Sequence, residues 1–123
     1  NNTDFVIWGS GKPLREFIFS KDIAKLSEWA LDNYTEDEPI IFSTSDAVPI
    51  KDMVDLIVEY MNFKGNVVWD RDKPDGQYRK PSSIEKLKSY LPDYEFTSVE
   101  DGLKETVEWF YENYEVLRKW RKR

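Results

Sequence analysis

Two short loops carry the residues whose types and spacing suit the binding of an anion. The first is WGSGKPLR at residues 8–15, which has two glycines, a lysine and an arginine. The second is KPDGQYRK at residues 73–80, which sets three cations around one glycine. Arginine presents a planar fork to phosphate oxygens, and lysine adds a point charge. Because the net charge of the chain is -6, two isolated basic loops indicate a small dianion as the ligand rather than a nucleic acid.

The first loop lacks the remaining features of a dinucleotide or P-loop site. A G-x-G-x-x-G fingerprint needs a third glycine where Leu14 stands, and a helix that begins inside the motif. A G-K-[ST] sequence is absent, since Pro13 follows Lys12. The aromatic and β-branched run at residues 16–19 favours a strand over a helix. We therefore expect a strand, a loop and a second strand, with side chains and loop amides as the groups that would hold a phosphate.

The composition excludes several kinds of chemistry. The chain has no histidine, which excludes a Ser-His-Asp triad, a histidine metal ligand and the usual general base near neutral pH. It has no cysteine, which excludes disulfides, thiolate chemistry and cysteine zinc sites, so no metal site is expected. Its 123 residues suit one domain. No long apolar run and no signal-peptide pattern occur, so we expect an untargeted chain without a membrane partner.

Alternating strand and helix patterns predict an α/β or mixed α+β fold. Strands are predicted at residues 5–8, 15–19, 39–43 and 66–69. Helices are predicted at residues 21–33, 50–64, 82–91 and 97–117. The run at 39–43 is almost wholly apolar, which is typical of a strand covered on both faces.

Local signals place the ends of the four helices. Ser20 is expected to cap the first helix, and Gly65 to end the second. Capping boxes at Ser82-x-x-Glu85 and Thr97-x-x-Glu100 are expected to start the third and fourth. An α/β enzyme normally has more βα units before its first anion loop, and here that loop begins at residue 8. We therefore expect the chain to be the C-terminal part of a larger protein.

The two loops and the helices between them resemble, in order and spacing, the GDP-L-fucose synthase family of extended short-chain dehydrogenases/reductases. WGSGKPLREF fits the family signature W-G-[ST]-G-x-P-x-R-[EQ]-F, and KPDGQYRK fits K-[PS]-D-G-x-x-[RK]-K. The resemblance covers residues 5–119 and implies that residues 1–123 are a C-terminal substrate-binding domain without its Rossmann cofactor domain. It also implies that residues 20–45 pack on that missing domain, with the strand at 39–43 at the edge of its sheet.

The resemblance also implies roles for individual residues. Trp8 would pack near the nucleotide, while Arg15 and Lys80 would pair with the diphosphate of a GDP-sugar. Further candidates for substrate binding are Gly9, Gly11, Asp75, Gly76 and Arg79. From the residues alone, other interpretations stay open: Trp8 suits a core aromatic, Lys80 a solvated loop charge, and Arg15 an ion pair with Glu16 or Asp22.

The implied activity is an NADPH-dependent epimerase/reductase that converts GDP-4-keto-6-deoxy-D-mannose to GDP-L-fucose in the cytoplasm as a homodimer. In the family, the NADP-binding loop, the catalytic Ser and the Tyr-x-x-x-Lys pair lie in the N-terminal portion. We therefore expect no catalytic and no cofactor-binding residue here, and no activity from the chain alone. Tyr60 and Lys64 fit Tyr-x-x-x-Lys, but they end an amphipathic helix and are expected to be structural. The alternatives are the substrate domain of another nucleotide-sugar epimerase or dehydratase, and a non-catalytic interaction domain.

Overall fold

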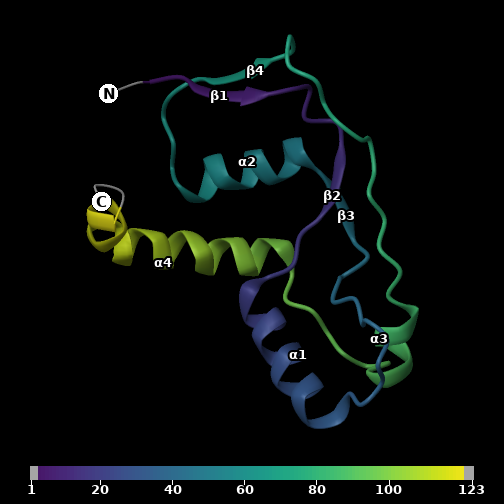
Figure 1. The fold of residues 1–123 in the computed structure, drawn as a ribbon. Helices are drawn as coiled ribbons and strands as arrows, with labels where there is room; N and C mark the ends of the chain where they lie inside the picture. The colour runs from purple at the N-terminus through teal and green to yellow at the C-terminus, as the bar shows by residue number, and fades with distance from the viewer. Residues whose placement is uncertain (1–2, 121–123) are drawn as a thin grey trace.

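The computed structural model describes residues 3–120 and shows a mixed α/β fold, as predicted (Figure 1). Its elements, in chain order, are β1 (Phe5–Trp8), β2 (Leu14–Glu16), α1 (Ser20–Asn33), β3 (Ala47–Pro49), α2 (Ile50–Tyr60), β4 (Val67–Asp70), α3 (Glu85–Tyr90) and α4 (Val99–Trp120). Among these residues, no helix is both long and apolar enough to cross a membrane.

The strands form two small sheets that meet at the first basic loop. β1 pairs in parallel with β4, which sets Trp8 opposite Asp70. β2 pairs antiparallel with β3. Between β1 and β2 the chain turns through Gly9 and Gly11, whose φ angles of 89° and 75° suit glycine. The predicted order of strand, loop and strand is confirmed.

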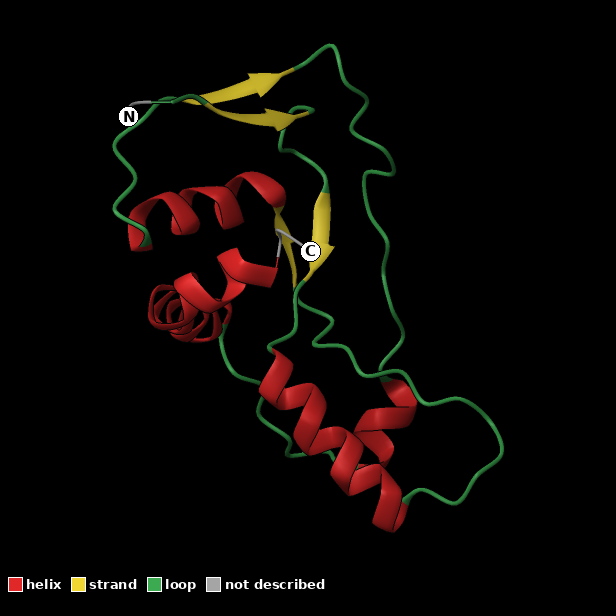
Figure 2. Ribbon diagram, turned by 60° about the vertical axis from the view of Figure 1, so that its left-hand side comes forward, coloured by secondary structure: helices red, strands yellow, loops and turns green. Residues whose placement is uncertain are grey.

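Two of the helices, α2 and α4, form layers on one side of the β1–β4 pair. α2 lies below the β1–β4 pair and α4 lies below α2 (Figures 1 and 2). α4 can approach the start of α1 closely because residue 102 is glycine; a Cβ there would come 3.1 Å from the Cβ of Phe19. The most buried apolar side chains are Leu26, Val54, Ile84, Leu87 and Val107.

Asp22 is a buried carboxylate that joins α1 to the segment before α4. Its side chain is only 2% exposed. One oxygen accepts the backbone N–H of Thr97 at 2.9 Å, and the other accepts the hydroxyl of Tyr94 at 3.2 Å. The two bonds satisfy a group that would otherwise be costly to bury.

The loop after α1 is held against α3 by charge and by aromatic contacts. The ammonium of Lys86 donates to the carboxylates of Glu36 at 2.8 Å and Glu38 at 3.1 Å. These bonds, that to Glu36 first, raise the pKa of Lys86. The ring of Tyr90 packs edge-on against Trp29 and Tyr34, with centroids 5.6 and 5.5 Å away. These contacts hold α1, the loop after it and α3 together.

The predicted strand at residues 39–43 is wrong. The structure leaves these residues outside any strand, and the short β3 forms later in the chain. Ile41 is 49% exposed. A strand covered on both faces needs neighbouring strands at its edges, and none of the described strands pairs with this run.

The predicted helix ends are shifted or wrong. α1 begins at Ser20, and no side-chain cap precedes it. The amide of Ser82 bonds to Glu16, so no capping box forms before α3. At α4 the box lies one residue later than predicted: the hydroxyl of Ser98 accepts the N–H of Asp101 and donates to its carboxylate.

The end of α2 was also misplaced. The helix stops at Tyr60, five residues before the glycine expected to end it. Asn62 takes the left-handed conformation there, with a φ of 49°. Asparagine is among the few other residues that adopt this conformation readily.

Candidate functional site

The two basic loops lie together, although they are far apart in the sequence. The long segment between β4 and α3 runs down beside β2 and β3 without forming a helix or strand (Figures 1 and 2). The N–H of Gly9 donates to the carbonyl of Asp70 at 2.9 Å. Further along, the N–H of Leu14 donates to the carbonyl of Tyr78 at 2.7 Å. The segment is thus fastened to both ends of the glycine loop.

Asp75 makes the strongest link between the loops. One of its oxygens accepts the backbone N–H of Ser10, and the other accepts the Ser10 hydroxyl at 2.6 Å. The hydroxyl bond first, and then the backbone bond, lower the pKa of the Asp75 carboxyl. Gly9 is required beside it, because a Cβ there would lie 2.5 Å from an Asp75 oxygen. With both oxygens engaged, Asp75 is placed to shape the loops.

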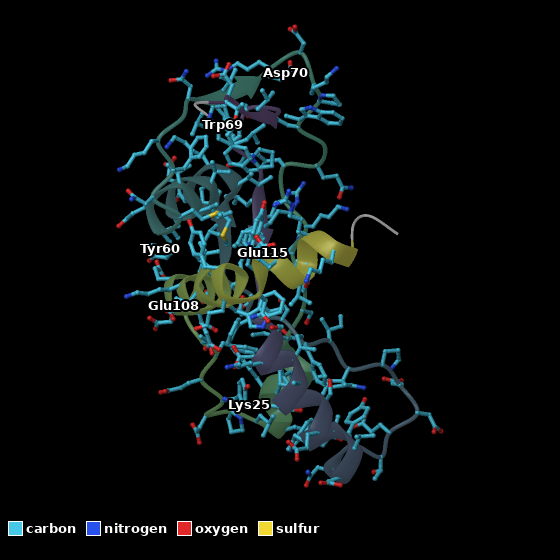
Figure 3. The ribbon with its side chains drawn as sticks, turned by 90° about the vertical axis from the view of Figure 1, so that its left-hand side faces the viewer. Lys25, Tyr60, Trp69, Asp70, Glu108 and Glu115 are labelled. Atoms are coloured by element: carbon cyan, nitrogen blue, oxygen red, sulfur yellow. The ribbon has the colours of Figure 1, made fainter. Side chains whose placement is uncertain are left out.

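Trp8 is not a core residue, so the interpretation of it as a core aromatic is wrong. It ends β1 and is 71% exposed. The ammonium of Lys73 lies over its ring, 5.6 Å from the centroid. Figure 3 shows Trp69 and Asp70 of the paired strand β4 at one end of the molecule, with Lys25 of α1 at the other. An exposed indole on a fixed strand end offers a flat apolar surface to a ligand.

Arg15 is directed by backbone carbonyls rather than by a carboxylate. Its Nη1 donates to the carbonyls of Leu14 at 2.6 Å and Gln77 at 3.0 Å. Among the described residues, neither Glu16 nor Asp22 comes within ion-pair distance of Arg15, so the predicted alternative of such a pair is wrong. The guanidinium is oriented by neutral acceptors and keeps its charge available to an anion.

Arg15 and Lys80 line the same hollow, whose volume is about 290 Å³. The remaining lining residues are Glu16, Phe17, Ile18, Phe42, Ser43, Thr44 and Ser82. Two cations, one carboxylate, three hydroxyl groups and several apolar side chains are therefore brought to one place. Trp8 is not part of this lining; it ends β1, directly before the glycine loop.

Glu16 organises this hollow and was not predicted as a site residue. Its carboxylate accepts the hydroxyl of Ser43 at 2.6 Å and the N–H of Ser82 at 3.1 Å. The Ser43 bond is the main cause of a lowered pKa at Glu16, and the charge of Arg79 adds to it. Glu16 thereby joins three segments of chain. Its place directly after Arg15 in the first signature was a signal that could have identified it.

The other predicted site residues are divided between backbone and surface roles. Gly11 is buried, and a Cβ there would lie 2.6 Å from the Trp69 ring. Gly76 has a φ of 73°, and a Cβ built on it would lie 3.9 Å from the guanidinium of Arg15. Lys12 and Arg79 are exposed.

The described residues do not fit a nicotinamide dinucleotide. Gly9 and Gly11 lead into β2 rather than into a helix. The N-terminus of α2 lies against this loop, but its first amides are already used. The N–H of Ile50 donates to the carbonyl of Pro13 at 3.0 Å and that of Lys51 to the carbonyl of Gly11 at 2.9 Å, so neither is left to meet a pyrophosphate. Tyr60 and Lys64 lie at the end of α2 and in the turn after it. That turn is fixed by Tyr111, whose hydroxyl donates to the carbonyl of Met61 at 2.9 Å. Within residues 3–120, no group of three potential metal ligands gathers.

Comparison with known proteins gives a consistent result. Residues 1–43 match the model of the NAD dependent epimerase/dehydratase family. A GDP-L-fucose synthase of Dictyostelium discoideum is 49% identical over 97% of this chain, which covers 38% of that protein. One of Escherichia coli is 35% identical over 96% of this chain, which covers 39% of that protein. A GDP-L-fucose synthetase of Naegleria fowleri, solved bound to NADP, superposes with a TM-score of 0.88 and 46% identity, covering 92% of this chain and 36% of that one.

The fold is that of part of an extended short-chain dehydrogenase/reductase, and the predicted fold class is confirmed. Within that class, the predicted resemblance to GDP-L-fucose synthases is also confirmed, over almost the whole chain. The chain spans a little over a third of the length of these relatives.

Proposed function

We propose that this chain is the GDP-sugar-binding part of an NADPH-dependent epimerase/reductase that makes GDP-L-fucose from GDP-4-keto-6-deoxy-D-mannose. The observation that carries this is the hollow shared by Arg15 and Lys80. Two cations on one hollow suit a diphosphate, and each charged hydrogen bond contributes about 1.5–3 kcal/mol. The similarity to GDP-L-fucose synthases supports guanosine as the nucleoside.

The exposed Trp8 would receive the nucleobase. Stacking of a base on an aromatic side chain contributes about 1–3 kcal/mol. Trp8 does not line the hollow, which agrees with a ligand whose base and diphosphate bind at different places. Base and phosphate contacts are therefore comparable in size, and neither should dominate the affinity.

Cofactor binding and catalysis belong, in this proposal, to another part of the protein. The Gly9–Gly11 loop does not suit a dinucleotide, and the chain has no histidine or cysteine for proton transfer. Residues 20–45 are proposed to pack on the part that binds NADPH, which agrees with Leu31 being 87% exposed and Ile41 49% exposed. The dimer and the cytoplasmic location implied by the resemblance stay predictions.

Titration calorimetry with GDP, UDP and dTDP tests the proposal. We expect the chain to bind GDP more tightly than the other two nucleotides, and Lys80→Ala to weaken that binding. Lys25→Ala is the matched control, because Lys25 is an exposed lysine that belongs to neither basic loop and does not line the hollow. We expect no turnover of GDP-4-keto-6-deoxy-D-mannose with NADPH by the chain alone. Turnover, or no nucleotide binding by the unaltered chain, would contradict the proposal.

The second candidate is the substrate part of a different nucleotide-sugar epimerase or dehydratase. The family description that matches residues 1–43 favours it, because that description covers more than one reaction. Tighter binding of UDP or dTDP than of GDP would decide for this candidate. Binding of none of the three would instead favour an interaction domain.

A further inference from the structure

Lys73 occupies a defined place above the exposed indole of Trp8. Its ammonium lies 5.6 Å from the ring centroid, within the range at which a cation is attracted to the negative face of an aromatic ring. Lys73 is itself exposed, and none of the hydrogen bonds or ion pairs found among residues 3–120 uses its side chain. The contact with Trp8 is therefore the interaction that this ammonium makes in the described structure.

One carbonyl fixes both partners of this contact. The carbonyl of Asp70 accepts the N–H of Gly9, the residue after Trp8, at 2.9 Å. The same carbonyl accepts the N–H of Lys73 at 3.3 Å. The strand register sets Trp8 opposite Asp70. The backbone next to the indole and the backbone that carries the ammonium therefore bond to the same oxygen, the carbonyl of Asp70. Asp75 and Ser10 join the same two segments a second time.

We propose that Lys73 is a positioning residue for the nucleobase. It holds the Trp8 indole in the exposed orientation in which the ring can receive a base. The inference rests on the proposed function, since it takes Trp8 as the surface that receives the base. An indole that is 71% exposed has little other packing to restrain it. A side chain that is ordered before the ligand arrives loses less freedom on binding, so a restrained indole binds a base more tightly.

A direct contact between Lys73 and a phosphate is the competing interpretation, and it makes different predictions. A positioning residue that acts through Trp8 should affect ligands that carry a base and leave inorganic pyrophosphate unaffected. A phosphate ligand should affect both compounds, and its effect should fall steeply with added salt. Comparing GDP with pyrophosphate therefore separates the two roles.

The experiment uses the full chain in four forms, with calorimetry as the measurement. We expect Lys73→Met, which keeps the apolar stem and removes the charge, to weaken GDP binding about two- to fivefold. Lys73→Arg should bind GDP within about twofold of the unaltered chain, because arginine also makes cation–π contacts. Lys64→Met, at another exposed lysine, is the matched control and should leave GDP binding unchanged. Pyrophosphate binding should be the same in all four.

A double-mutant cycle gives the decisive result. In a Trp8→Ala background, Lys73→Met should have no further effect on GDP binding, because the ring through which Lys73 acts is gone. Additive losses, or a loss of pyrophosphate affinity in Lys73→Met, would overturn the inference and leave the proposed function standing. Equal GDP affinity in Lys73→Met and the unaltered chain would overturn it as well. Absence of GDP binding by the unaltered chain would overturn the proposed function, and this inference with it.

Discussion

Asp75 and Ser10 are joined by two hydrogen bonds, one from the backbone N–H and one from the hydroxyl of the serine. This pair connects the loop after β4 to the loop between β1 and β2. Because both loops contribute predicted ligand-binding cations, this pair helps to set the geometry of the site. The predictions below begin with this pair.

Asp75→Asn should lower the thermal stability of the chain in a pH-dependent way. The folded pKa of Asp75 is lowered below its ordinary value of 3.8 by the Ser10 bonds. Its contribution is therefore present above the unfolded pKa and is lost as the pH falls through the folded pKa. The difference in Tm between the unaltered chain and the variant should be largest near pH 6 and should shrink as the pH falls below 3.8 and through the lowered folded pKa. Asp72→Asn, in the same loop, is the control; a constant difference across this pH range would contradict the assignment.

Lys80→Ala and Arg15→Ala should weaken ligand binding more than they slow catalysis in the complete enzyme. Contacts to a diphosphate exist in the ground state and in the transition state, so their loss should raise KM with little change in kcat. We expect about a tenfold effect or more from each, since a charged hydrogen bond is lost. Arg15→Ala should cost more than Lys80→Ala, because Arg15 also bonds to the carbonyl of Gln77. Steady-state kinetics with varied substrate measures this, and a fall in kcat at constant KM would argue for a chemical role.

Gly11→Ala should destabilise the chain more than Gly76→Ala. Both residues have positive φ angles, and for alanine that conformation costs about 1–2 kcal/mol. At residue 76 the added Cβ meets nothing closer than 3.9 Å, whereas at residue 11 it would lie 2.6 Å from the Trp69 ring. Gly76→Ala therefore measures only the free-energy cost of the backbone conformation and serves as the control. The free energies of unfolding from urea titrations should differ, and equal values would show that the Trp69 ring moves aside at no cost.

Asp22→Ala should destabilise the chain by about 2–3 kcal/mol, because it leaves buried hydrogen-bond donors without a partner. The affected donors are the N–H of Thr97 and the hydroxyl of Tyr94. Asp32→Ala, at an exposed carboxylate on the same helix, should change the free energy of unfolding by less than about 0.5 kcal/mol. Urea titration measures both variants. Similar values for the two would mean that Asp22 does not join α1 to the segment before α4.

Much of the fold could be predicted from the sequence because the signals involved were local. The strand at residues 5–8, the turn at Gly9 and Gly11, and the amphipathic helices are set by alternation, by backbone freedom and by apolar spacing. The helix caps could not be predicted as well. Ser82 and Thr97 satisfy the capping pattern, but their amides bond to Glu16 and Asp22, which are distant in the sequence.

The distinction between local signals and contacts of residues distant in the sequence also applies to the site. Cations beside glycines indicated the two loops, and the family resemblance selected Arg15 and Lys80 within them. The structure places both on one hollow. The role of Glu16 depends on Ser43 and Ser82 arriving beside it, which no local pattern indicates. At residues 39–43 the local pattern indicated a strand that does not form. Its sequence is typical of a buried strand, but strand pairing requires a neighbour, and none of the described strands provides one.

The segment between β4 and α3 carries Lys73 at one end of the site and Lys80 at the other, with no helix or strand between them. An extended chain advances about 3.3 Å per residue, so the span between the two cations depends on how many residues separate them. Deleting one residue there would shorten that reach without removing a charge. If the chain binds a GDP-sugar as proposed, the number of residues in this segment, as much as their identity, sets the distance between the contacts to the base and those to the diphosphate.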